Sequence, residues 1–285
     1  MATKETKDPL STEARSPLCS YDELPEWLQI NPLIRQGYRK NVHTLRACYG
    51  SLWYIHNETV NIWSHLFAGL VFAGLNVLGA EVLAPGLTIG LAGGMASMAW
   101  TDRLVLRMFL LGANLCLVFS AMFHLLHPHS PHVSQNTLHL DFLGIVLNIL
   151  TTVISITHFL PLPSSYAVIY QCLCVSMALA TYTVILHPSL RAAGRAAGLR
   201  ACIFIAFAGS GVASLTHVWL VHGYKGLNAG IPFKEIVLES LLYLVGALIY
   251  AKRWPEGRLS GKFDIWVSHY LNPWPHHETL TDAKF

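Results

Sequence analysis

The chain has 285 residues, of which 53% are hydrophobic and only 12% are charged, and its mean hydropathy is +0.43. Soluble globular domains carry about 25% charged residues, so this composition excludes an ordinary soluble domain and indicates an integral membrane protein. The formal net charge of +3 is too small to indicate a partner such as nucleic acid.

The N-terminal region divides into two parts. Residues 1–19 are polar, and we expect a disordered cytoplasmic tail without the apolar run of a cleavable signal peptide. Residues 20–56 instead predict a short amphipathic helix at the inner headgroup region, because Asp22 is an N-cap candidate placed before Trp27 and Leu28. This cytoplasmic segment is either a lid that packs on the bundle or a docking element for a partner.

The middle of the chain predicts a transmembrane helical bundle over residues 57–252. A helix needs about 20 mostly apolar residues to cross ~30 Å of hydrocarbon. Six segments meet this requirement, namely 61–83, 105–127, 139–161, 165–187, 200–222 and 232–252. The apolar stretch 84–100 contains Pro85 and many small residues, and we expect it to form an interfacial or re-entrant loop. The fold class is therefore an all-α integral membrane protein with six transmembrane helices, followed by a cytoplasmic tail over 253–285.

The positive charges predict the orientation of these spans. If the N-terminus is cytoplasmic, 15 of the 19 Lys and Arg residues fall in inner segments and 4 fall in outer ones. Inner loops carry the excess of positive charge in membrane proteins. We therefore expect a multi-pass protein with a cytoplasmic N-terminus, in either the plasma membrane or an endomembrane.

Polar side chains inside the spans are candidates for function, because hydrocarbon penalises a polar group that lacks a partner. Glu58, Asn61 and His65 follow the spacing i, i+3, i+7 and share one face of the first predicted helix. Two interpretations stay open for this face. It is either a hydrogen-bonded anchor against neighbouring helices or a direct participant in chemistry.

A second group lies where spans two and three meet the inner membrane face. Ser120 and His124 are one turn apart near the end of span two, and Asp141 opens span three. A histidine, a serine and an aspartate in a site of low dielectric constant indicate a metal centre or a hydrogen-bonded structural cluster. A serine-hydrolase triad fits less well, because two of its members on one helical turn leave no obvious oxyanion hole. Gly144 would let another helix approach closely.

Five stretches together resemble the progestin and adipoQ receptor family, which includes the adiponectin receptors, the fungal Izh proteins and the bacterial haemolysin III-type proteins. The resemblance covers about residues 20–266 and is closest to the adiponectin-receptor-like branch. The stretches that carry it are Asn31–Arg39, His56–His65, Ser120–His124, Leu140–Gly144 and Gly261–Trp266.

The resemblance implies a seven-helix bundle with a cytoplasmic N-terminus and a zinc ion near the inner face. His124 matches a zinc ligand of the family. Ser120 and Asp141 match residues that hold water or assist proton transfer. The implied activity is hydrolysis of a ceramide-like amide, coupled to receptor-like signalling and lipid metabolism. The implied partners are membrane lipids and an unidentified extracellular or lipid ligand.

The chain departs from the family pattern after Trp266. The family places two further zinc ligands on a seventh helix there, whereas only Ser268 and His269 match that pattern here. Pro273 follows one turn later, and no apolar run of about 20 residues follows before Phe285. The seventh helix is thus expected to be missing, with His269 as the one other candidate ligand. Three functions remain open: a zinc-dependent lipid amidase, a non-catalytic receptor or scaffold, and an inactive truncated isoform.

Overall fold

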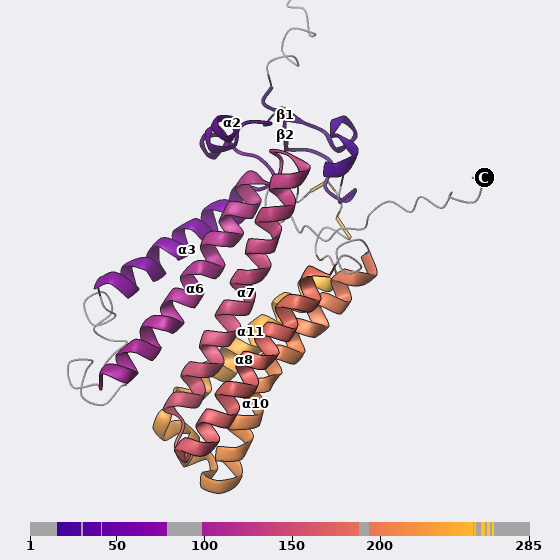
Figure 1. The fold of residues 1–285 in the computed structure, drawn as a ribbon. Helices are drawn as coiled ribbons and strands as arrows, with labels where there is room; N and C mark the ends of the chain where they lie inside the picture. Colours follow the sequence, from indigo (N-terminus) through magenta and orange to yellow (C-terminus); the bar gives the residue numbers. More distant parts are fainter. Residues whose placement is uncertain are drawn as a thin grey trace, which may run out of the picture.

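The computed structural model describes residues 16–29, 31–40, 42–78, 99–187 and 194–252, together with 254, 258–259, 261–262 and 264. A small N-terminal domain lies across one end of a bundle of long helices (Figure 1). The domain contains β1 (Leu18–Cys19), η1 (Tyr21–Glu23), η2 (Glu26–Leu28), β2 (Tyr38–Arg39), α2 (Leu45–Gly50) and η3 (Ser51–Trp53). The bundle contains α3 (Thr59–Leu78), α6 (Trp100–Leu126), α7 (Pro131–Phe159), α8 (Ser164–Leu186), α10 (Gly194–Gly230) and α11 (Phe233–Lys252).

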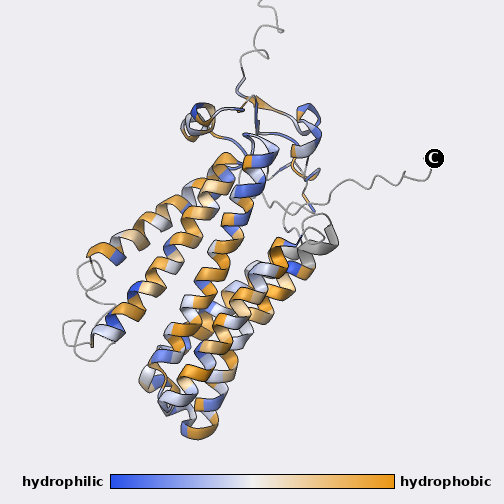
Figure 2. Ribbon diagram, viewed as in Figure 1, coloured by the Kyte–Doolittle hydropathy of each residue, from blue (hydrophilic) through white to orange (hydrophobic). Residues whose placement is uncertain are grey.

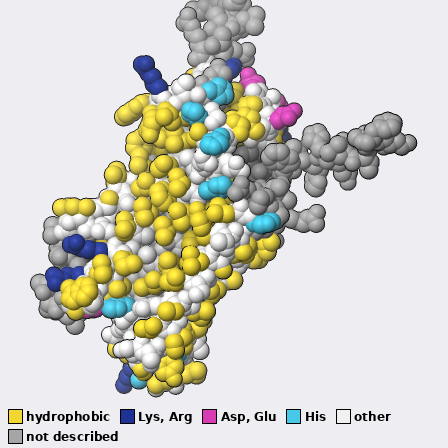
Figure 3. All heavy atoms as spheres, in the orientation of Figure 1, with side chains coloured by type: hydrophobic (Ala, Val, Ile, Leu, Met, Phe, Trp, Pro, Cys, Tyr) yellow, Lys and Arg dark blue, Asp and Glu magenta, His cyan; other side chains and the backbone are white. Residues whose placement is uncertain are grey.

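The prediction of an all-α membrane protein is confirmed. Five described helices are long and apolar enough to cross a membrane, namely α3, α6, α7, α8 and the Leu199–Gly230 part of α10. The 20-residue helix α11 coincides with the sixth predicted span at 232–252. Apolar residues predominate along the bundle, whereas the N-terminal domain is more hydrophilic (Figure 2). In the space-filling view, hydrophobic side chains cover the middle of the helices, and Lys and Arg lie towards the ends (Figure 3).

Local signals in the sequence explain several helix boundaries. α7 begins at Pro131, eight residues before the predicted span, because the Ser130 hydroxyl caps it by accepting a hydrogen bond from the Val133 N–H. α10 is interrupted at Gly223, which has a φ of 61° and lies directly after the predicted span end at residue 222. The re-entrant loop predicted for 84–100 lies almost entirely outside the described residues.

The helices pack in an order that places α6 between α3 and α7 (Figure 1). On the other side of α7, α8 and α10 pack against it and against each other. The contact between α6 and α7 is very close at Gly144, where an added Cβ would lie 2.8 Å from Cα of Cys116. The expected close approach at Gly144 is therefore confirmed, and α6 is the partner helix.

The predicted amphipathic helix beginning at Asp22 is wrong. The chain forms two 3-10 turns there instead, and the cap is Ser20, whose backbone N–H and hydroxyl both donate to the Glu23 carboxylate. Pro25 explains the break, because it disfavours helical backbone in the residue before it, and Leu24 is indeed extended.

This N-terminal domain has a core of its own. The buried side chains are Cys19, Leu24, Leu28, Ile34 and Tyr38. The expected disorder of residues 1–19 fails at its end, because Leu18 and Cys19 form β1 and pair antiparallel with β2.

The described part of the C-terminal segment lies against this domain. Oδ2 of Asp264 accepts hydrogen bonds from the backbone N–H groups of Arg35 at 3.2 Å and Gln36 at 2.9 Å. The N–H of Gly261 donates to the carbonyl of Leu33 at 3.3 Å. Residues 265–285, including the expected zinc ligand His269, lie outside the described residues.

Candidate functional site

The structure brings Ser120, His124 and Asp141 together at the end of the bundle that carries the N-terminal domain. Ser120 and His124 lie in the last two turns of α6, and Asp141 lies in the third turn of α7. Ser120 and His124 both lie near the buried carboxyl group of Asp141. A short connection between α6 and α7 produces this convergence, because it sets the end of one helix beside the beginning of the next.

Glu58 is the residue that most directly orients His124. Its side chain is completely buried, and Oε2 lies 2.7 Å from Nδ1 of His124. Asn61 donates to the same oxygen at 2.8 Å, and Asn57 donates to Oε1 at 3.5 Å. A carboxylate acceptor fixes the proton of the imidazole on Nδ1, which leaves Nε2 with its lone pair. This is the arrangement that a metal-binding histidine requires.

His65 completes the predicted polar face of α3. Its ring lies edge-on to that of His124, with 6.0 Å between the ring centroids. Its Nδ1 is buried and has no hydrogen-bond partner among the residues that the structure describes. Glu58, Asn61 and His65 therefore all face the His124 region, which favours a role in the site over a purely structural anchor.

Two histidines just outside the membrane-spanning helices are held neutral. Burial, followed by the charge of Arg39, lowers the pKa of His56 to about 3 and that of His127 to about 3. Neutral His56 fits its local contact, because its Nδ1 accepts a hydrogen bond from the Glu58 N–H at 3.1 Å.

The donor set fits part of a metal site. His124 offers one oriented imidazole nitrogen beside a carboxylate and a hydroxyl. Within the described ranges, however, no group of three or more His, Cys, Asp or Glu side chains is arranged to hold a metal ion. A catalytic zinc ion normally has three protein ligands. The described residues thus supply one ligand and its supporting partners.

The positions of Ser120, His124 and Asp141 in the sequence predict that they meet, but no pattern in the sequence connects Glu58 to His124. The two residues are 66 positions apart, and no spacing rule links them. The signal that could have found the contact was chemical: a carboxylate at a predicted helix start needs a partner, and an imidazole lies at the same membrane face.

Comparison with known proteins identifies the class. Residues 53–271 match the haemolysin-III-related family, and the chain belongs to it. Its curated relatives are adiponectin receptor, Izh, and progestin and adipoQ receptor proteins, as the resemblance predicted.

Three relatives illustrate the extent of the match. The adiponectin receptor protein of Drosophila melanogaster is 32% identical over 91% of this chain and 56% of its own length. The ADIPOR-like receptor IZH2 of Saccharomyces cerevisiae is 32% identical over 89% of this chain and 78% of its own length. The progestin and adipoQ receptor-like protein 1 of Caenorhabditis elegans is 32% identical over 91% of this chain and 57% of its own length. The chain thus spans little more than half the length of the fly and worm relatives.

Proposed function

We propose that this chain is an adiponectin-receptor-like membrane protein with a zinc-dependent hydrolytic site, which acts on ceramide-type lipid amides near the cytoplasmic face. The observation that carries the proposal is the convergence of Ser120, His124 and Asp141 with a buried carboxylate on Nδ1 of His124. The orientation belongs to the proposal and rests on the distribution of Lys and Arg along the sequence.

Each residue of the site has a distinct role. Nε2 of His124 would hold the zinc ion, and Glu58 would accept a hydrogen bond from Nδ1 of the same ring. His269 is the candidate for a further ligand. When bound, zinc acts as a Lewis acid and lowers the pKa of water from about 16 towards 7.

Asp141 is the candidate general base. Its carboxylate would accept the proton of the attacking water and then deliver it to the leaving amine nitrogen. Ser120, which lies near this carboxylate, is the candidate for holding it in place. The site residues lie on α6 and α7, two helices that can cross the membrane, so an acyl chain would enter from the lipid.

Turnover of a fluorescent ceramide by the purified full chain in lipid nanodiscs tests the proposal. We expect activity in the wild type and a loss of at least about 100-fold in His124→Ala and in Asp141→Asn, the magnitude typical of a missing acid–base group. His132→Ala is the matched control, because His132 is exposed in the first turn of α7. Undiminished turnover in His124→Ala would refute the hydrolytic proposal.

A non-catalytic receptor or scaffold is the second candidate. It is favoured by the folded N-terminal domain, and by the lack of a three-ligand group in the parts of the chain that the structure describes. In this case signalling output would disappear when residues 20–46 are deleted, whereas His124→Ala would retain it. The hydrolytic proposal expects output to fail in His124→Ala.

A further inference from the structure

Arg39, the last residue of β2, extends a buried guanidinium group from the N-terminal domain to the end of α6. Its Nη2 donates to the carbonyl of His124 at 2.6 Å, and its Nη1 donates to the carbonyl of Leu125 at 2.9 Å. Nη1 also donates to the Ser51 hydroxyl at 3.1 Å. The residue is 4% exposed, and a buried charge is tolerated only when hydrogen bonds surround it in this way.

The two carbonyls are groups that a helix cannot satisfy by itself. The last four carbonyls of an α-helix have no intrahelical N–H partner, and α6 ends at Leu126. A cation at this end also interacts favourably with the helix dipole. Arg39 therefore caps α6 from another domain and fixes the backbone of its last turn.

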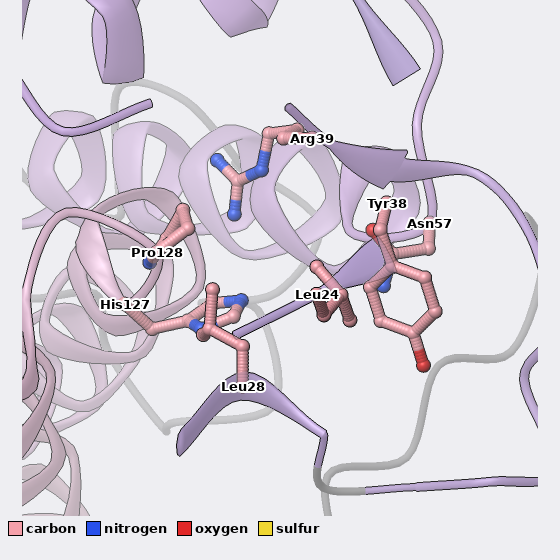
Figure 4. A pocket seen from close by; sticks show the side chains of 7 residues that line it. All are labelled: Leu24, Leu28, Tyr38, Arg39, Asn57, His127 and Pro128. Atoms are coloured by element: carbon pink, nitrogen blue, oxygen red, sulfur yellow. The ribbon is translucent and has the colours of Figure 1, made fainter. Parts of the chain in front are cut away.

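The surroundings of Arg39 keep water away from this contact. The N-terminal domain packs over the junction that follows α6 and leaves a small cavity, to which Arg39 contributes one wall (Figure 4). The other lining residues are Leu24, Leu28, Tyr38, Asn57, His127 and Pro128. Few solvent molecules can compete for the carbonyls, so the guanidinium contacts are strong ones.

His124 is consequently held at two points by two different segments. Glu58, just before α3, binds Nδ1 of the ring, and Arg39 binds the carbonyl of the same residue. The ring contact determines which nitrogen carries the proton in the neutral imidazole, and the backbone contact determines where Nε2 lies. Metal and catalytic groups lose function when displaced by about 0.5 Å.

We propose that Arg39 is a positioning residue for the metal site: it locks the last turn of α6 from the N-terminal domain and so sets the location of His124 Nε2. The inference rests on the proposed zinc-binding role of His124. It makes the N-terminal domain part of the architecture of the site, because displacing the domain would release the turn that carries the ligand.

Zinc affinity of full-chain variants, measured by competition with a chromogenic chelator, tests the proposal. We expect Arg39→Met to weaken zinc binding by about 10- to 100-fold, as for other supporting residues of metal sites. Arg39→Lys should lie between this variant and the wild type, because an ammonium group can reach one carbonyl but lacks the fork of the guanidinium.

Lys40→Met is the matched control. It removes a positive charge from the adjacent residue, which is exposed and pairs with Glu23 at 3.6 Å. We expect its zinc affinity to stay within about twofold of the wild type. Equal affinities of Arg39→Met and Lys40→Met would overturn the positioning role.

Hydrogen exchange of the metal-free proteins separates this inference from the zinc proposal. Arg39→Met should accelerate amide exchange in the segment 120–128 but not in α8, whereas Lys40→Met should change neither. If the wild type binds no zinc, the proposed function fails. Faster exchange of Arg39→Met confined to 120–128 would still establish that Arg39 fixes the last turn of α6. Unchanged exchange in Arg39→Met would overturn it, whatever the zinc result.

Discussion

Oε2 of Glu58 lies 2.7 Å from Nδ1 of His124 and is completely shielded from solvent. The contact joins the segment before α3 to the last turn of α6, and it gives the imidazole a defined tautomer. The Glu58 carboxylate is therefore the buried acceptor that determines which ring nitrogen of His124 faces a ligand.

Glu58→Gln tests this acceptor. The amide preserves shape but lacks the charge that holds the proton on Nδ1, so we expect zinc affinity to fall by about 10- to 100-fold. Glu58→Ala should in addition lower the free energy of unfolding by about 1–3 kcal/mol, because it leaves buried Asn and His groups unsatisfied. Chelator competition and thermal unfolding in detergent measure the two effects. Glu23→Gln, in the exposed capping box, is the control, and an unchanged zinc affinity in Glu58→Gln would contradict the tautomer argument.

Gly144→Ala tests the contact between α6 and α7. The new Cβ would lie 2.8 Å from Cα of Cys116, so the two backbones must separate. We expect a loss of about 1–3 kcal/mol in the free energy of unfolding, as for other overpacked interfaces. Gly209→Ala, where an added Cβ meets nothing within 4 Å, should be neutral or slightly stabilising. Thermal unfolding of the pair gives the comparison, and equal stabilities would show that the helices do not pack this closely.

Acid should destabilise the protein through His56. Its pKa is lowered from 6.5 to about 3, first by burial and then by Arg39, so the folded state keeps the imidazole neutral. The unfolded chain binds a proton below about pH 6.5. The stabilising contribution is thus present above pH 6.5 and is lost as the pH falls towards 3, by about 1 kcal/mol in the first unit.

Unfolding measured between pH 7.5 and 5.5 in the wild type and in His56→Gln checks this effect. The glutamine variant should show a shallower pH dependence, because it cannot be protonated. If the free energy of unfolding changes equally with pH in both proteins, the acid sensitivity belongs to another group.

The proposed cytoplasmic position of the N-terminus predicts which side of the membrane each end of α7 faces. Gln135→Cys lies near its start, and Ser165→Cys lies just beyond its end in an exposed position of α8. In a background without native cysteines, a membrane-impermeant thiol reagent applied to intact cells should label Ser165→Cys only. Labelling of Gln135→Cys under these conditions would invert the topology.

The sequence predicted the spans well because about 20 apolar residues satisfy the bilayer wherever they occur. It also placed His124 near Asp141, since a short connection between two spans leaves few alternatives. The contacts of Arg39 could not be predicted, because they depend on how a separate domain packs on the end of α6. The Glu58–His124 contact depends on how α3 packs against α6, and only the chemistry of the two groups pointed to it. Trp27 and Leu28 led to a wrong prediction for the same reason. Their apolar character suited a helix on the membrane, whereas Leu28 lies in the core of the N-terminal domain and Trp27 packs against that core.

The zinc content of the purified full chain, measured by mass spectrometry beside His124→Ala, tests the central claim most directly. We expect about one zinc ion per wild-type chain and a near-complete loss of zinc in the variant. A wild type without zinc, or a variant that retains the wild-type content, would contradict it.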